Sequence, residues 1–125
     1  MKNELRIGNY INNYNKVLSI TDDGLLCTGL SIIGVVIIEN PKPIPLTEEI
    51  LLKCGFEWSI QHQAHKHEKF KYVIDFYNSH PQFNSSVCFL NKEHRRGENL
   101  ICIQYLHQLQ NLYFALTNEE LTVNL

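Results

Sequence analysis

The sequence predicts an α+β domain built on a mostly antiparallel, curled sheet or small partial barrel, with two helices at about 47–54 and about 105–116. Three observations point there. The first forty residues are β-rich runs separated by turn signals, a proline-rich stretch precedes a clearly marked helix start, and large apolar residues recur at helical spacing near the C-terminus. A length of 125 residues fits one domain over 1–125.

The N-terminal region predicts short strands at 5–11, 16–21, 25–29 and 31–39. The "DDG" at 22–24 is a turn signal, after which the chain is expected to run back beside the preceding strand. The run "SIIGVVIIE" is rich in β-branched residues, which favours a strand buried on both faces.

The short helix has recognisable start and stop signals. Thr47 can cap its first turn, where the helix dipole favours the carboxylates of Glu48 and Glu49. Gly55 ends it, and Phe56 can pack back on the last turn as in a Schellman motif.

The centre of the chain predicts a loop or exposed strand end over 58–68, followed by strands. Residues 69–77 alternate, with Phe70, Tyr72, Ile74 and Phe76 on one face and Lys69, Lys71 and Asp75 on the other. Strands at 87–90 and 100–104 flank a charged hairpin loop, and a last strand is expected at 121–125.

The C-terminal helix raises the question of what its polar face does. Tyr105, Leu109, Leu112 and Leu116 cluster at 3.6 residues per turn, with Leu106 and Tyr113 at one edge. The opposite face of this helix is expected to face solvent and to carry an aromatic ring surrounded by polar groups. This is the composition of an interface hot spot. We therefore expect a partner-binding face, covered by the N-terminal β segment of the same chain or by a second copy in a homodimer, made of His107, Gln110, Asn111 and Phe114.

Composition narrows the function classes. A hydrophobic share of 44% fits a globular protein, and a net charge of -2 gives no electrostatic reason to expect a nucleic-acid partner. Four dispersed cysteines without a C-x-x-C pair predict reduced, buried thiols in a cytoplasmic protein, although two disulfides stay an alternative. No apolar run is long enough for a membrane span, and the N-terminus has no signal-peptide pattern.

Two weak patterns offer other chemistry. His62, His65 and His67 could ligate zinc, but their spacing matches no established site, and a solvated loop is the alternative. Lys92, Arg95 and Arg96 could contact phosphate, although Glu93 and Glu98 neutralise that loop. No nucleophile elbow, phosphate loop or H-E-x-x-H motif occurs, so no catalytic residue and no cofactor is predicted.

Three blocks, "LRIGNYI" at 5–11, "PIPLTEEILLKCGFE" at 43–57 and "YLHQLQNLYFALTNEEL" at 105–121, cover about a third of the chain. They resemble a family of short uncharacterised bacterial and phage proteins. The resemblance implies a phage or mobile-element accessory protein, without an assigned activity or catalytic residues. We therefore expect a small intracellular interaction module that acts by binding and self-association. The alternatives are a nucleotide or nucleic-acid binding accessory protein and, third, a metal-dependent enzyme.

Overall fold

The computed structural model describes residues 5–11, 15–17, 19–20, 26–31, 34–38, 42–80, 85–92 and 101–124. Its largest unit is a five-stranded antiparallel sheet in which each strand pairs with the next along the chain, in the order β10-β9-β8-β7-β6. The strands are β6 (Glu57–Ser59), β7 (Ala64–Lys66), β8 (Tyr72–His80), β9 (Ser85–Lys92) and β10 (Ile101–Ile103). The sheet is curled but does not close, because β6 and β10 remain its edges.

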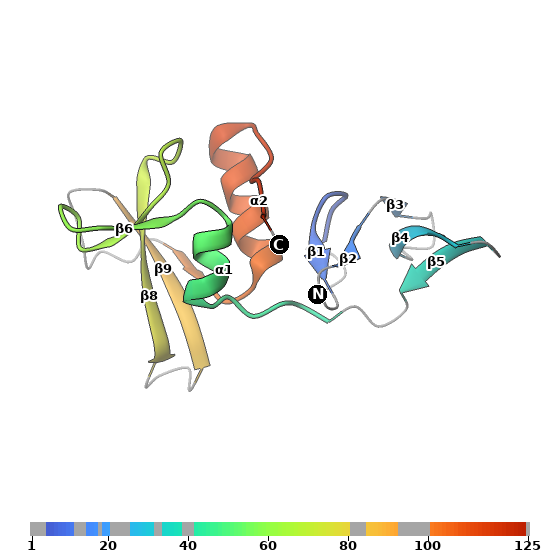
Figure 1. Cartoon of the computed structure of the whole chain (residues 1–125), viewed down its shortest axis with the longest axis horizontal. Helices are drawn as coiled ribbons and strands as arrows, with labels where there is room; N and C mark the ends of the chain where they lie inside the picture. The colour runs from blue at the N-terminus through green and yellow to red at the C-terminus, as the bar shows by residue number, and fades with distance from the viewer. Residues whose placement is uncertain are drawn as a thin grey trace.

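Two helices lie on one side of this sheet (Figure 1). The short helix α1 (Glu48–Lys53) precedes β6, and the longer helix α2 (Leu106–Thr117) follows β10. The α+β prediction with one short and one longer C-terminal helix is therefore confirmed. Among the described residues, neither helix combines the length and apolar character that a membrane span requires.

The N-terminal strands form two further small antiparallel sheets. One pairs β1 (Tyr10–Ile11) with β2 (Asn15–Lys16), and the other has the order β3 (Ser19–Ile20), β4 (Leu26–Ser31) and β5 (Gly34–Ile38). In Figure 1, β1 and β2 lie beside α2 on the side away from the five-stranded sheet, and β3 to β5 lie farther out. The curled sheet thus comes from residues 57–103, not from the first forty.

The start and end of α1 follow its sequence signals. The Ile50 amide donates to Thr47 Oγ1 at 3.2 Å, which caps the first turn. At the other end Gly55 has φ +88°, and the Phe56 amide donates to the Leu51 carbonyl at 3.0 Å. This pair of features is the predicted Schellman ending, and it turns Phe56 into the core.

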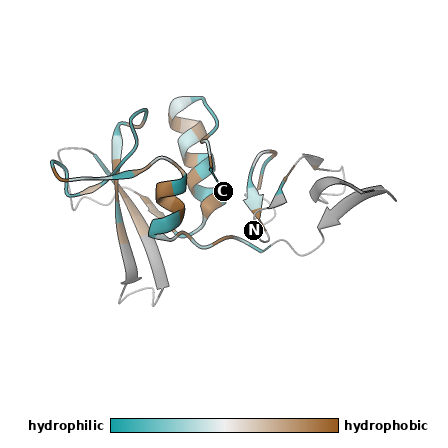
Figure 2. Cartoon of the chain, viewed as in Figure 1, coloured by the Kyte–Doolittle hydropathy of each residue, from teal (hydrophilic) through white to brown (hydrophobic). Residues whose placement is uncertain are grey.

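The core lies between the five-stranded sheet and the two helices. Figure 2 shows that α1 carries a hydrophobic and a hydrophilic side, as expected of a helix packed on one face. The buried residues of this core come from the segment before α1, both helices, the sheet and the C-terminal tail; they are Ile44, Leu46, Ile50, Leu51, Cys54, Phe56, Phe70, Ile74, Cys88, Leu90, Ile103, Leu106, Leu109, Tyr113 and Leu121. Phe70 and Ile74 therefore face the core as predicted, with Tyr72 and Phe76 packed against it.

Four sequence predictions are corrected. Ser31 pairs with Gly34, so the expected single strand at 31–39 is instead the end of β4 and the whole of β5; its burial on both faces lies outside the described side chains. Asp75 is buried and accepts a hydrogen bond from Asn91 Nδ2 at 2.8 Å, so it does not belong to a wet face. A polar strand residue can be buried there because the amide satisfies its carboxylate.

The other two corrections concern the ends of the main sheet. The segment 58–68 was expected to be a loop or an exposed strand end. The loop is wrong, because the segment contains most of the β6–β7 hairpin, in which Trp58 pairs with His65. Strands of three residues are too short for alternation to reveal them. Residues 121–124 form no strand; instead Leu121 is buried and the Asn124 amide donates to the Lys53 carbonyl at 2.8 Å, at the end of α1.

Candidate functional site

The polar face of α2 is covered from within the chain. His107 and Gln110 are fully buried, so their placement on a wet face is wrong. Gln110 Nε2 donates to the Gly8 carbonyl at 3.0 Å, and Gln110 Oε1 accepts from the Tyr10 amide at 2.9 Å. These two hydrogen bonds attach the turn before β1 and the first residue of β1 to α2.

Two more contacts complete this N-terminal clasp. Asn9 Nδ2 donates to Asn111 Oδ1 at 2.8 Å. Arg6 lies over the ring of Phe114 at 4.6 Å from its centroid and also forms an ion pair with Glu120. Arg6, Asn9, Gln110, Asn111 and Phe114 are called the N-terminal clasp below.

The four residues predicted to bind a partner therefore meet the chain's own N-terminal segment or its interior, which was one of the two expected coverings. Phe114 keeps 38% of its surface exposed. A homodimer contact through the remaining surface of Phe114 stays a prediction.

The three candidate zinc ligands have separate surroundings. His62 Nδ1 lies 2.9 Å from Ser59 Oγ within the β6–β7 hairpin. The ring of His65 stands edge-on to Trp58, and that of His67 lies between Phe56 and Tyr113, with centroid separations of 5.2 and 5.1 Å. Within the described ranges, no three His, Cys, Asp or Glu side chains are grouped so that they could hold a metal ion.

Among the side chains that the structure describes, the most exposed aromatic one lies on the edge of the sheet instead. Trp58, on edge strand β6, is 57% exposed, and Ile60, just after it, is 85% exposed. Beneath the indole, His65 is only 4% exposed, and its ring lies 5.5 Å from that of Trp58 in an edge-to-face contact. We call the strand β6 with Ile60 the β6 edge surface.

The residue beneath this surface, His65, also lies close to α1. His65 Nε2 lies 3.4 Å from Glu48 Oε1, but no ring nitrogen of His65 makes a hydrogen bond of good geometry with the described residues. A buried imidazole without such bonds is costly, so its packing against Trp58 and Ile74's strand must hold it in place. The pairing of His65 with both Trp58 and Ile74 fixes that position in the sheet.

A cavity of about 550 Å³ opens beside the β6 edge surface. It is lined by the end of α1, by β6 and by the residues after β7; these are Gly55, Glu57, Trp58, Ser59, Lys66, His67 and Glu68. Burial lowers the pKa of His67 below its usual value, a shift that the neighbouring Glu68 carboxylate partly opposes. His67 Nδ1 accepts the Lys69 amide at 3.1 Å, which leaves Nε2 as the protonated nitrogen of the neutral ring.

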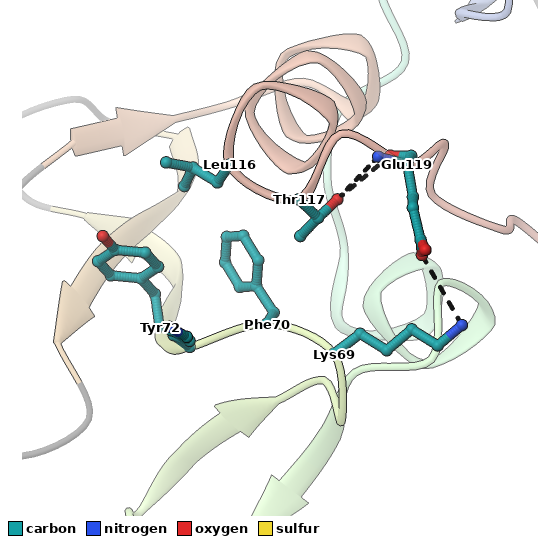
Figure 3. Close-up of a pocket in the computed structure, with 7 residues that line it drawn as sticks. Lys69, Phe70, Tyr72, Leu116, Thr117 and Glu119 are labelled. Carbon is teal, nitrogen blue, oxygen red and sulfur yellow. Dashed lines mark hydrogen bonds and ion pairs between the residues drawn. The ribbon is translucent and has the colours of Figure 1, made fainter.

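A second cavity of about 550 Å³ lies at the C-terminal end of α2 (Figure 3). Phe70 and Tyr72 form an aromatic wall, with ring centroids 5.5 Å apart, and Leu116 lies above them. On the other side Lys69 Nζ lies 3.8 Å from Glu119 Oε2. Lys71 and Thr117 also line it, so the cavity joins apolar rings to lysine side chains.

Most of the loop predicted to contact phosphate lies outside the residues that the structure describes. Lys92 is exposed at the end of β9, whereas Arg95 and Arg96 lie outside the described residues.

The cysteines differ in exposure. Cys54, Cys88 and Cys102 are free, which matches the prediction of reduced thiols for these three. Burial raises the pKa of Cys54 to about 12 and also raises that of Cys88. Cys102, however, is exposed on edge strand β10, so the expectation that all the cysteines are buried is wrong for it. The side chain of Cys27 lies outside the description.

No known protein family matches this chain, and neither characterised proteins nor solved structures give a significant match. The resemblance of the three sequence blocks therefore stays a prediction.

Sequence reasoning missed the β6 edge surface. The available signal was the chain's single tryptophan, followed by an isoleucine, inside an otherwise polar segment.

Proposed function

We propose that this chain is a small intracellular protein-binding module whose docking site is the β6 edge surface. The observation that carries the proposal is the exposed Trp58 on an edge strand, held from beneath by the buried His65. Tryptophan is the residue most enriched among energetic hot spots of interfaces. The free state of the three described cysteines supports an intracellular location, where thiols are kept reduced.

The backbone of β6 adds a second means of binding. No strand of the described part of the chain lies beyond β6. A sheet edge presents main-chain N–H and C=O groups that can pair with an extended segment of another protein. The partner would gain backbone hydrogen bonds from the edge and apolar contact from Trp58 and Ile60.

The test compares Trp58→Ala with Ile7→Ala in binding to proteins of the native host. Ile7 is a matched control because it has the same exposed fraction but lies on the N-terminal segment. A partner recovered with the wild type is purified and its affinity for each variant is measured. We expect Trp58→Ala to weaken binding by about 30-fold, the effect of losing a hot spot of about 2 kcal/mol. Equal affinity of wild type and Trp58→Ala would overturn the proposal, as would a loss seen only with Ile7→Ala.

The same variants test self-association. Sedimentation of the wild type over a range of concentrations measures any dimer. If a dimer forms and Trp58→Ala abolishes it, a second copy of this chain is the occupant of the β6 edge surface. A dimer that survives that substitution assigns self-association to another surface, such as the remaining surface of Phe114.

The cavity in Figure 3 favours a second candidate function, the binding of a nucleotide-like ligand. Aromatic side chains stack on bases, and lysines contact phosphate; here Tyr72 and Lys71 would take those parts. The ion pair of Lys69 with Glu119 reduces the positive charge available. Titration with adenosine monophosphate, followed by NMR shifts of the Tyr72 and Lys71 amides, tests it. Unchanged shifts at millimolar ligand would exclude this candidate.

A further inference from the structure

We propose that the cavity beside β6 receives a basic side chain, arginine or lysine, from an extended partner segment that docks on the β6 edge surface. The inference rests on the proposed function and names the chemistry of the partner. It follows from the charges that line the cavity, from the indole at its mouth and from the position of both at a sheet edge.

The lining of the cavity favours a cation. Glu57 and Glu68 are exposed carboxylates at its rim. Among the described residues of the lining, the only ammonium belongs to Lys66, whose Nζ donates to the carbonyls of His67 and Phe70. These two carbonyls partly satisfy that ammonium, whereas the two carboxylates face solvent.

His67 adds no positive charge at neutral pH. Its burial opposes protonation, so the ring presents a neutral imidazole to the cavity. The lining therefore carries more negative than positive charge, and a basic side chain complements it.

Trp58 provides a cation-binding face. Indole is the best cation–π partner among the aromatic side chains, with a useful range of about 6 Å between the charge and the ring centroid. The edge-on contact with His65 restricts the orientation of the indole, so Trp58 would lose little side-chain freedom when a partner binds. The carboxylates of Glu57 and Glu68 line the same cavity as this indole.

Gly55 makes room for the His67 ring beside the end of α1. A Cβ at this position would lie 3.1 Å from Cδ2 and Nε2 of His67, closer than ordinary side-chain contacts. Gly55 also lines the cavity itself. The glycine that ends the helix therefore also allows His67 to lie against the backbone there.

Trp58 is the only tryptophan of the chain, so intrinsic indole fluorescence reports directly on this site. The probe is the peptide acetyl-Thr-Val-Arg-Val-Thr-amide, and the comparison peptide carries glutamine in place of arginine. We expect saturable changes in Trp58 emission, with affinity for the arginine peptide about tenfold higher than for the glutamine peptide.

The variants Glu57→Gln and Glu68→Gln, combined, should lower affinity for the arginine peptide about tenfold and remove most of its salt dependence. The matched control is Glu49→Gln, since Glu49 is an exposed carboxylate of α1 that pairs with Lys53 and does not line the cavity. Thermal melting shows that each variant is folded. No emission change, equal affinity for both peptides, or an equal effect of the control variant would each overturn the inference.

Binding of the host partner by Trp58→Ala and by the double glutamine variant separates the docking site from its preference for a basic residue. If Trp58→Ala loses a host partner while the double glutamine variant keeps it, the β6 edge surface is a docking site and the basic-residue inference is wrong. If Trp58→Ala has no effect on the host partner and the wild type binds both peptides with equal affinity, both are wrong.

Discussion

The substitution Gln110→Ala tests whether the N-terminal segment is held by α2. Gln110 is almost fully buried, and both ends of its side-chain amide are used, one by the Gly8 carbonyl and one by the Tyr10 amide. Alanine removes both partners, and each backbone group left unsatisfied costs about 1 kcal/mol at the low end of the usual range. The low end applies because Gly8 and Tyr10 are only half-buried, so water can reach both backbone groups.

Loss of the buried side-chain methylene of Gln110 adds about 0.8 kcal/mol. The expected decrease in the free energy of unfolding is therefore about 2 to 3 kcal/mol, measured by urea denaturation. Gln110→Met keeps the volume and should retain most of the hydrogen-bond part of the loss, about 2 kcal/mol. Gln61→Ala, on an exposed side chain of the β6–β7 hairpin, is the control and should stay within about 0.5 kcal/mol of wild type.

Hydrogen exchange separates global from local effects. If the N-terminal segment opens on its own, Gln110→Ala will speed exchange of the Tyr10 amide while the five-stranded sheet keeps its protection. A Tyr10 amide that stays protected, together with an unfolding free energy within 0.5 kcal/mol of wild type, would refute this account of the clasp.

Thr47→Ala should cost about 1 kcal/mol of stability, because the helix cap is lost; denaturation indistinguishable from wild type would remove the cap from the account. In native buffer a thiol reagent should label Cys102 rapidly, and should label slowly the two buried residues Cys54 and Cys88; fast labelling of a buried thiol would contradict the packing. His67 has a lowered pKa, so the unfolded chain binds its proton first as pH falls below about 6.5, and folding stability should decrease there. Replacement of His67 by glutamine should remove that part of the decrease, which NMR titration and denaturation at several pH values can measure.

The sequence alone determined the elements whose signals are local. Thr47 at the start and Gly55 at the end specify α1, because a hydroxyl that caps an amide and a residue free to take a positive φ act within one turn of the helix. The helical spacing of leucines likewise predicted α2, and the alternation of large apolar residues with polar ones predicted β8.

The tertiary structure decided what those elements contact. Whether Gln110 faces water depends on residues about a hundred positions away, and no periodicity encodes such a contact. The buried arc of α2 is accordingly shifted from its predicted stripe, because the sheet covers one side and the N-terminal segment covers another. His107 and Gln110 are buried, whereas Leu116 of the predicted stripe is 45% exposed.

The β6 edge surface also depends on the tertiary structure. Trp58 and His65 are seven residues apart in a polar segment, and only the hairpin register places one ring against the other. Cys102 resembles a core residue in sequence but lies exposed on edge strand β10. A strand lies at an edge when no further strand pairs with it. That depends on the whole fold and not on the residues next to it in the sequence.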